Sequence, residues 1–215
     1  MTHDHSMDPA EMLGQDFWDE RYRSSQKLWS GNPNPQLVDR LTGITPGDAL
    51  DVGCGEGADA IWLAAQGWQV TGADVSQVAL DRAAAHAREA GQRAATSWQR
   101  VDVLTWQPPL QAYDLVTASF LHLPSAVRDD VHRRLATAVR PGGRLLVVAH
   151  HVSDLHTKMR RPDMPDMFFT AEQVAAVLSA QDWDIREAAA PERSAIDPDG
   201  QATTVRDTVL LAVRR

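Results

Sequence analysis

An alternation of short apolar segments with longer amphipathic ones constrains the fold more than any other feature of the sequence. DALDVG and WQVTGAD are typical of strands, whereas ADAIWLAAQG and SQVALDRAAAHAREAG are typical of helices. ATSWQRVDV, AYDLVTASF and RLLVVAHH predict three further strands. Parallel strands need crossover connections, so this order predicts an α/β fold, a doubly wound and mostly parallel sheet with helices on both faces.

Two regions are expected along the chain. Residues 1–45 are predicted to form an N-terminal helical lid or flank, with an amphipathic helix in PAEMLGQDFWDERYRS and a second, short helix after it. Residues 46–215 are predicted to form the remainder of a single domain. Its last segments, DWDIREAAAPE and TTVRDTVLLAVRR, are expected to pair as an antiparallel hairpin, which brings the predicted sheet to seven strands.

Charge and composition exclude several classes of function. A formal net charge of −8 disfavours sequence-independent binding to nucleic acid, which needs clustered Lys and Arg. No apolar stretch approaches the roughly 20 residues that cross a bilayer, and the first residues do not resemble a secretion signal. The lone cysteine, Cys54, excludes an internal disulfide. We therefore expect a cytoplasmic protein with a small-molecule partner and without a membrane or nucleic-acid site. A monomer or homodimer without a metal site is expected as well, since no acid–histidine spacing fixes a tetrahedral set of ligands.

A glycine-rich turn, ALDVGCGEGADA, follows the first predicted strand. Ligands of open parallel sheets bind beyond the carboxyl ends of the strands, and glycines there bring bare backbone against a ligand. Asp74 ends the second strand, where it can accept hydrogen bonds from both hydroxyls of a ribose. Asp102 follows the third strand, where it can accept from an exocyclic amine. This order of groups predicts a site for a nucleoside-shaped cofactor.

The spacing of the glycines distinguishes between cofactors. Dinucleotide sites use G-x-G-x-x-G, which brings a pyrophosphate to a helix N-terminus. Here the pattern is Asp51-x-Gly53-x-Gly55-x-Gly57, and Glu56 within it would repel a pyrophosphate. A nicotinamide-dependent oxidoreductase is therefore the disfavoured alternative.

Several segments together resemble the class I S-adenosylmethionine-dependent methyltransferases. They are ALDVGCGEGADA, VTGADVS, RVDVL, YDLVTASFLHLP and VRPGGRLLVV. FWDERYRSSQKLWSGNPNPQLV, FFTAEQV and TVRDTVLLAVRR look more narrowly like the small methyltransferases of the tellurite-resistance and thiopurine type. The resemblance implies a Rossmann-like fold whose last strand runs antiparallel between the fifth and sixth. It also implies S-adenosylmethionine as cofactor, S-adenosylhomocysteine as product and a small-molecule acceptor.

The resemblance also implies roles for individual residues. Asp51 would order the glycine loop near the methionine ammonium group, Asp74 would hold the ribose, and Asp102 would accept from the adenine amine. Trp29 is a further candidate, because an aromatic face attracts a sulfonium, although it can equally serve packing. The expected cofactor residues are Asp51, Gly53, Cys54, Gly55, Gly57, Asp74, Val75, Asp102, Val103, Ala118 and Trp29.

The acceptor is expected beside the ends of the first, fourth and fifth strands. The candidates there are Tyr22, Ser119, Phe120, His150 and His151. Because side chains alternate along a strand, at most one of the two adjacent histidines should face the cavity. His122 is the candidate catalytic base, and the alternative is a hydrogen-bonded histidine that steadies its loop.

Methyl transfer is an in-line displacement, and it depends mainly on alignment of the reacting atoms. A thiolate needs no base, whereas an alcohol or phenol benefits from one. A non-catalytic S-adenosylmethionine-binding regulator, which has kept the nucleoside site and lost its acceptor pocket, is the second alternative function.

Overall fold

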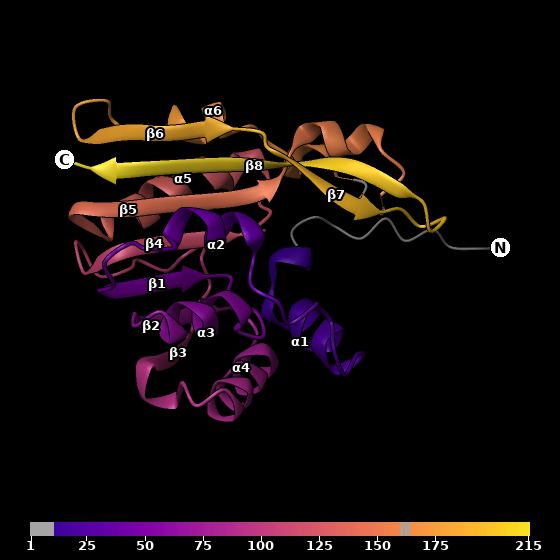
Figure 1. Ribbon diagram of the computed structural model, residues 1–215, viewed down its shortest axis with the longest axis horizontal. Helices are drawn as coiled ribbons and strands as arrows, with labels where there is room; N and C mark the ends of the chain where they lie inside the picture. Colours follow the sequence, from indigo (N-terminus) through magenta and orange to yellow (C-terminus); the bar gives the residue numbers. More distant parts are fainter. Residues whose placement is uncertain (1–10, 160, 162–163) are drawn as a thin grey trace.

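The computed structural model describes residues 11–159, 161 and 164–215. Its sheet has the strand order β3-β2-β1-β4-β5-β8-β6, and β7 pairs with β8 outside this series (Figure 1). The strands are β1 Asp48–Val52, β2 Gln69–Asp74, β3 Thr96–Arg100, β4 Tyr113–Ser119, β5 Val139–His150, β6 Trp183–Ala189, β7 Glu192–Ile196 and β8 Ala202–Arg214. The predicted α/β sheet of seven mostly parallel strands is confirmed, with β7 added to it.

The direction of the strands follows the expected pattern. β1 to β5 run parallel to their neighbours. β8 runs antiparallel between β5 and β6, as the resemblance implied. β7 was not predicted as a separate strand, because ERSAI has little apolar alternation. It forms a hairpin with the outer part of β8, where Glu192 pairs with Arg206.

Helices cover both faces of the sheet. α2 and α3 contribute Leu37 and Leu63 to the apolar layer on one face. α5 and α6 contribute Leu135 and Val174 to the layer on the other face. α4 packs mainly against β3. The helices are α1 Gln15–Arg23, α2 Pro35–Leu41, α3 Ala58–Ala65, α4 Gln77–Glu89, α5 Ser125–Thr137 and α6 Ala171–Ala175.

Short turns of 3-10 helix join these elements. They are η1 Glu11–Leu13, η2 Arg93–Ala95, η3 Val152–His156 and η4 Pro165–Met167. Within the ranges that the structure describes, no helix is long and apolar enough to cross a membrane.

The N-terminal segment differs in detail from the expected helix. η1 and α1 are separated at Gly14, whose ψ of 160° is extended, and residues 9 and 10 lie outside the described part. α1 lies across the carboxyl ends of the parallel strands, beside α4 (Figure 1). This placement brings the N-terminal segment over the edge of the sheet where the glycine loop lies.

Candidate active site

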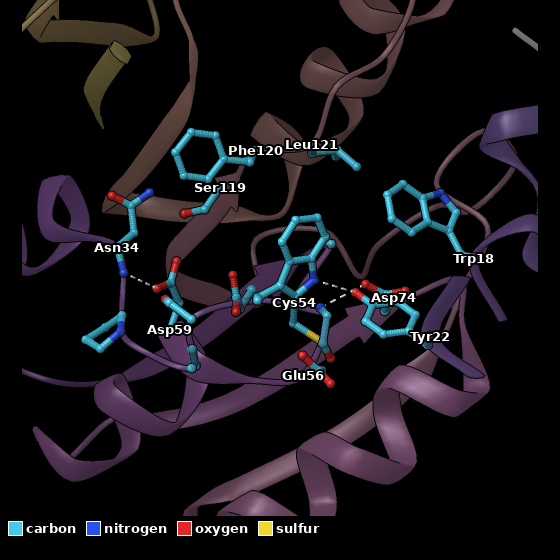
Figure 2. Close-up of a pocket in the computed structure, with 18 of the residues that line it drawn as sticks. Trp18, Tyr22, Asn34, Cys54, Glu56, Asp59, Asp74, Ser119, Phe120 and Leu121 are labelled. Atoms are coloured by element: carbon cyan, nitrogen blue, oxygen red, sulfur yellow. Dashed lines mark hydrogen bonds between the residues drawn. The ribbon is translucent and has the colours of Figure 1, made fainter. Parts of the chain in front are cut away.

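A cavity of about 1110 Å³ lies at the carboxyl ends of the parallel strands, beneath the N-terminal segment. Figure 2 shows Ser119 and Phe120 near Asn34 and Asp59 in one part of it, and Trp18 and Tyr22 near Asp74 in another. Most of the predicted residues line this cavity. They are Tyr22, Trp29, Asp51, Gly53, Cys54, Gly55, Asp74, Val75, Asp102, Val103, Ser119, Phe120, His122 and His150.

Three predicted residues lie outside the lining of the cavity. A Cβ on Gly57 would lie 2.8 Å from Trp98 and 2.9 Å from Ala83, so this glycine permits close packing rather than ligand approach. Ala118 is 1% exposed in a central strand between β1 and β5. His151 caps η3, where its Nδ1 accepts a hydrogen bond from the Ser153 backbone N–H at 3.2 Å.

The glycine loop is held by Asp74. Its Oδ2 accepts from the Gly55 backbone N–H at 2.9 Å, and its Oδ1 accepts from the Ser76 N–H at 2.9 Å. Gly55 has a φ of +52°, and a Cβ there would lie 2.8 Å from the Tyr22 hydroxyl. That hydroxyl accepts a 3.0 Å hydrogen bond from the Trp29 indole N–H. The loop therefore requires glycine at this position, and two aromatic residues of the N-terminal segment close over it.

Three buried carboxyl groups surround the loop. Burial, together with the neighbouring carboxylates of Asp59 and Asp74, raises the pKa of Asp51 to about 8. Burial also raises the pKa of Asp59 and of Asp74, although backbone N–H donors oppose the shift in both. Oδ1 of Asp51 accepts from the Thr117 hydroxyl at 2.9 Å, and its buried Oδ2 has no partner among the described residues. A cation placed between these groups would relieve their repulsion.

Asp59 and Asn34 are pocket residues that the sequence analysis missed. Asp59 Oδ1 accepts a 2.6 Å hydrogen bond from the Asn34 backbone N–H (Figure 2). The Asn34 side chain caps α2. Asp59 lies two residues after Gly57, in the first turn of α3. Its position in the helix was visible in the sequence, but its contact with residue 34 was not.

Glu56 lines the cavity and forms an ion pair. Its carboxylate pairs with Arg82 at 2.9 Å, and its side chain is 8% exposed. The guanidinium of Arg82 also donates to the Tyr22 carbonyl at 2.7 Å. Glu56 is thus compensated by α4, so its charge argues less strongly against a phosphate ligand than the sequence suggested.

An aromatic cluster forms the wall of the cavity beside β4 and β5. The Phe120 and His150 rings lie 4.6 Å apart, and the His122 and His150 rings stack at 5.0 Å and 25°. Phe120 has a φ of +56°, which is unusual for a residue other than glycine, and its side chain reaches the cavity. Burial lowers the pKa of His122 to about 4 and that of His150 to about 2. Both imidazoles are therefore neutral at neutral pH.

The hydrogen bonds of His122 favour the steadying role over the catalytic one. Its Nδ1 lies 2.9 Å from the Phe120 carbonyl, to which it donates. Its Nε2 then accepts from the His150 backbone N–H at 3.4 Å. Because both ring nitrogens are engaged within the protein, His122 has no lone pair directed at an acceptor.

Comparison with known proteins agrees with the geometry. The strand order and the glycine loop are those of the class I methyltransferase fold. Residues 49–143 match the methyltransferase domain family, in agreement with the resemblance that the sequence motifs carry. The cofactor of these enzymes is S-adenosylmethionine. This match counts against the nicotinamide-dependent alternative.

Individual relatives cover part of the chain. Methyltransferase GfsG of Streptomyces halstedii is 37% identical over 115 residues, which are 52% of this chain and 41% of the relative. A 2-heptyl-1-hydroxyquinolin-4(1H)-one methyltransferase of Mycobacteroides abscessus is 28% identical over 149 residues, which are 62% and 63% of the two chains. The chain thus spans less than two thirds of the length of these relatives.

Solved structures show the same fold over nearly the whole chain. One of them superposes with a TM-score of 0.73 at 23% identity, over 93% of this chain and 92% of that one. It was solved for the conversion of a disulfide bond into a thioacetal group during echinomycin biosynthesis. TehB from Haemophilus influenzae superposes with a TM-score of 0.67 at 19% identity, over 94% and 67%. Among the described residues, no group of three or more His, Cys, Asp or Glu side chains is arranged to hold a metal ion.

Proposed function

We propose that this chain transfers the methyl group of S-adenosylmethionine to a small-molecule acceptor by in-line displacement. The observation that carries the proposal is the cluster of three buried carboxyl groups around a glycine loop in one cavity. The cofactor carries a sulfonium and an ammonium group, and such a cluster suits a cation. The unpartnered Oδ2 of Asp51 supplies a buried acceptor for an ammonium donor.

The residues of the cavity fit the parts of the cofactor in order. Asp51 and Gly53 would receive the methionine part, and Asp74 would accept from the ribose while it still holds the loop. Val75 and Asp102 line the same cavity, on the side expected for adenine. Tyr22, Trp29 and Gly57 would then differ in role: the two aromatic residues enclose the ligand, and the glycine only permits packing of the loop.

When bound, the cofactor supplies an electrophilic methyl group. The chain's own task is to align the acceptor behind that methyl and to exclude water, because alignment supplies most of the rate in such displacements. The cofactor's sulfur would keep the electron pair of the carbon–sulfur bond as the acceptor displaces it. Since His122 is engaged internally, we infer that acceptors react as thiolates, phenolates or unprotonated amines, without a histidine base.

A small acceptor is supported by the size of the cavity and by relatives. A volume of about 1110 Å³ suits a nucleoside cofactor together with a small second ligand. The quinolone methyltransferase among the relatives is named for a small-molecule acceptor. By analogy we extend that chemical class to this chain.

The test is to incubate the full chain with S-adenosylmethionine and a panel of thiols, phenols and heterocyclic amines. Mass spectrometry should find S-adenosylhomocysteine and a product heavier by one methylene in equal amounts. Asp74→Ala should lower turnover at limiting cofactor by about ten- to a hundredfold, whereas Asp81→Ala, at an exposed position of α4, should not. Tight cofactor binding without product across the panel would favour the non-catalytic regulator instead.

A further inference from the structure

We infer that the acceptor is a planar aromatic acid, with its ring on the Phe120 and His150 side chains and its carboxylate on Arg193. The inference rests on the proposed function, because it names the substrate class of the same site. All three residues line the one cavity. Phe120 follows the last residue of β4, His150 ends β5 and Arg193 lies in β7. The fold therefore brings together groups that are far apart in the sequence.

The aromatic part of this subsite is already stacked in the structure. Phe120 lies 4.6 Å from the His150 ring at 41°, and it is 37% exposed. His122 stacks behind His150 at 5.0 Å, and Phe168 lies 5.9 Å from His122. Stacked and tilted rings at these separations attract a further flat ring. The positive φ of Phe120 directs an apolar side chain into the cavity at the cost of backbone strain.

This aromatic surface carries no charge near neutral pH. Burial, and in His150 the neighbouring His122, Arg161 and Arg193, lower the pKa of both imidazoles far below 7. A neutral imidazole presents a π-face without a competing cation. The charge that selects the ligand must therefore come from another residue of the wall.

Arg193 supplies that charge from a fixed position. Its Nε donates to both carboxylate oxygens of Asp207, at 3.1 and 2.8 Å. Asp207 is 0% exposed and also accepts from Gln36 Nε2 at 3.2 Å. In the antiparallel pairing of β5 with β8, Asp207 stands directly opposite His150. Opposite residues share a face of the sheet, so the guanidinium is held on the same side as the aromatic wall.

The orientation of the guanidinium leaves its terminal edge for a ligand. Within the part of the chain that the structure describes, the hydrogen bonds of Arg193 use Nε, and its side chain is 29% exposed in the cavity wall. The two Nη groups of a fixed guanidinium match the two oxygens of a carboxylate. Because Asp207 prevents rotation of the side chain, little conformational entropy is lost when a ligand binds.

The simpler reading is that Arg193 only compensates the buried Asp207. The two readings differ in what they predict for ligands, since compensation alone gives no preference for an acid over its ester. Benzoate, methyl benzoate and cyclohexanecarboxylate separate the contributions. Benzoate has both a flat ring and a negative charge. Methyl benzoate has the flat ring alone, and cyclohexanecarboxylate has the charge without a flat ring.

The experiment measures binding of these probes to the full chain by calorimetry, with and without saturating S-adenosylhomocysteine. We expect benzoate to bind at least tenfold more tightly than either of the other probes. Arg193→Gln should weaken benzoate binding at least tenfold and bring it level with methyl benzoate. Arg206→Gln is the matched control, because that side chain is 49% exposed and pairs with Glu192 on the surface.

A second variant keeps the test informative if Arg193→Gln unfolds. Phe120→Ala removes a 37% exposed side chain and should bring benzoate level with cyclohexanecarboxylate. Equal affinity of the wild-type chain for benzoate and methyl benzoate would overturn the inference, as would equal effects of the Arg193 and Arg206 substitutions. If S-adenosylhomocysteine binds and benzoate does not, only this inference fails. If benzoate binds through Arg193 and S-adenosylhomocysteine does not, the proposed function fails.

Discussion

Oδ1 of Asp19, in α1, accepts a 2.6 Å hydrogen bond from the hydroxyl of Ser76, the residue that caps α4. The same oxygen accepts from the Val78 backbone N–H at 3.3 Å. Asp19 is only 4% exposed. Because Ser76 also donates its backbone N–H to Asp74, one short turn connects the N-terminal helix to the residue that holds the glycine loop.

Removal of this contact should loosen the N-terminal segment and weaken cofactor binding together. We expect Asp19→Ala to lower the free energy of unfolding by about 1–3 kcal/mol, the cost of leaving buried donors without an acceptor. Affinity for S-adenosylhomocysteine should fall as well, since α1 carries Tyr22. Glu20→Ala, at an exposed neighbouring position with 76% side-chain exposure, is the control. Equal melting temperatures and affinities in the two variants would show that the contact contributes nothing.

Cofactor binding should release a proton from Asp51. In the free protein burial and the nearby Asp59 and Asp74 raise the pKa of this carboxyl to about 8, so it is largely protonated at pH 7. A bound cation lowers that pKa, so affinity for S-adenosylmethionine should rise between pH 6 and pH 7.5. Calorimetry in buffers of different ionisation enthalpy measures the protons released. Uptake of protons, or affinity that falls with pH, would contradict the assignment of Asp51.

The same carboxyl should make the ligand-free protein less stable as pH rises. A pKa raised from 3.8 to about 8 means that the native state holds a proton that the unfolded state has lost. This stabilising contribution is complete below pH 4 and is lost as pH rises towards 8. Asp51→Asn, which cannot ionise, should reduce that loss between pH 5 and 8 in urea unfolding experiments. An unchanged slope in the variant would assign the pH dependence to other groups.

Gly57 should be intolerant of any side chain for reasons of packing. Gly57→Ala adds a Cβ at 2.8 Å from Trp98 in a backbone with φ of +87°. We expect a loss of about 2–4 kcal/mol, which combines overpacking with the left-handed conformation. Gly91→Ala is the matched control, since its φ is +71° and no atom lies within 4 Å of the added Cβ. Chemical denaturation measures the free energy of unfolding of both variants. Equal losses would mean that Trp98 and Ala83 move aside at no cost in stability.

Substitution of His122 should slow all acceptors alike. Both of its ring nitrogens are hydrogen-bonded to backbone groups, so His122→Ala disturbs the turn after β4 rather than a proton transfer. The expected result is the same fractional loss of kcat/KM for a thiol and for a phenol. His156→Ala, at an exposed position, controls for the loss of an imidazole. A phenol slowed about a hundredfold more than a thiol would restore His122 as a general base.

The sheet could be predicted because its signals are local. Leu50 and Val52 face one apolar layer and Ala49 faces the other, which is the alternation expected of a strand covered on both sides. β7 lacked such a signal, and it forms because the turn at residues 197–200 returns the chain onto β8. The break at Gly14 was likewise hidden inside an amphipathic pattern that continues through it.

The residues of the site likewise include some that local sequence signals predict and others that only contacts distant in sequence bring into place. Gly53 and Gly55 follow β1 and Asp74 ends β2, so their meeting at one edge of the sheet could be predicted. Arg193 and Asn34 reach the cavity through contacts with Asp207 and Asp59, which no spacing in the sequence indicates. His151 illustrates the limit of strand alternation, which excluded one of two adjacent histidines but did not say which.

The measurement that tests the central claim most directly is calorimetric titration of the chain with S-adenosylmethionine, S-adenosylhomocysteine and NAD. The acidic cluster and the glycine loop predict micromolar binding of the two adenosyl compounds, and binding of NAD at least a hundredfold weaker. Asp74→Ala should weaken the adenosyl compounds by about ten- to a hundredfold, the loss of charge-assisted hydrogen bonds. Tight binding of NAD, with neither adenosyl compound bound, would contradict the assignment of the cavity.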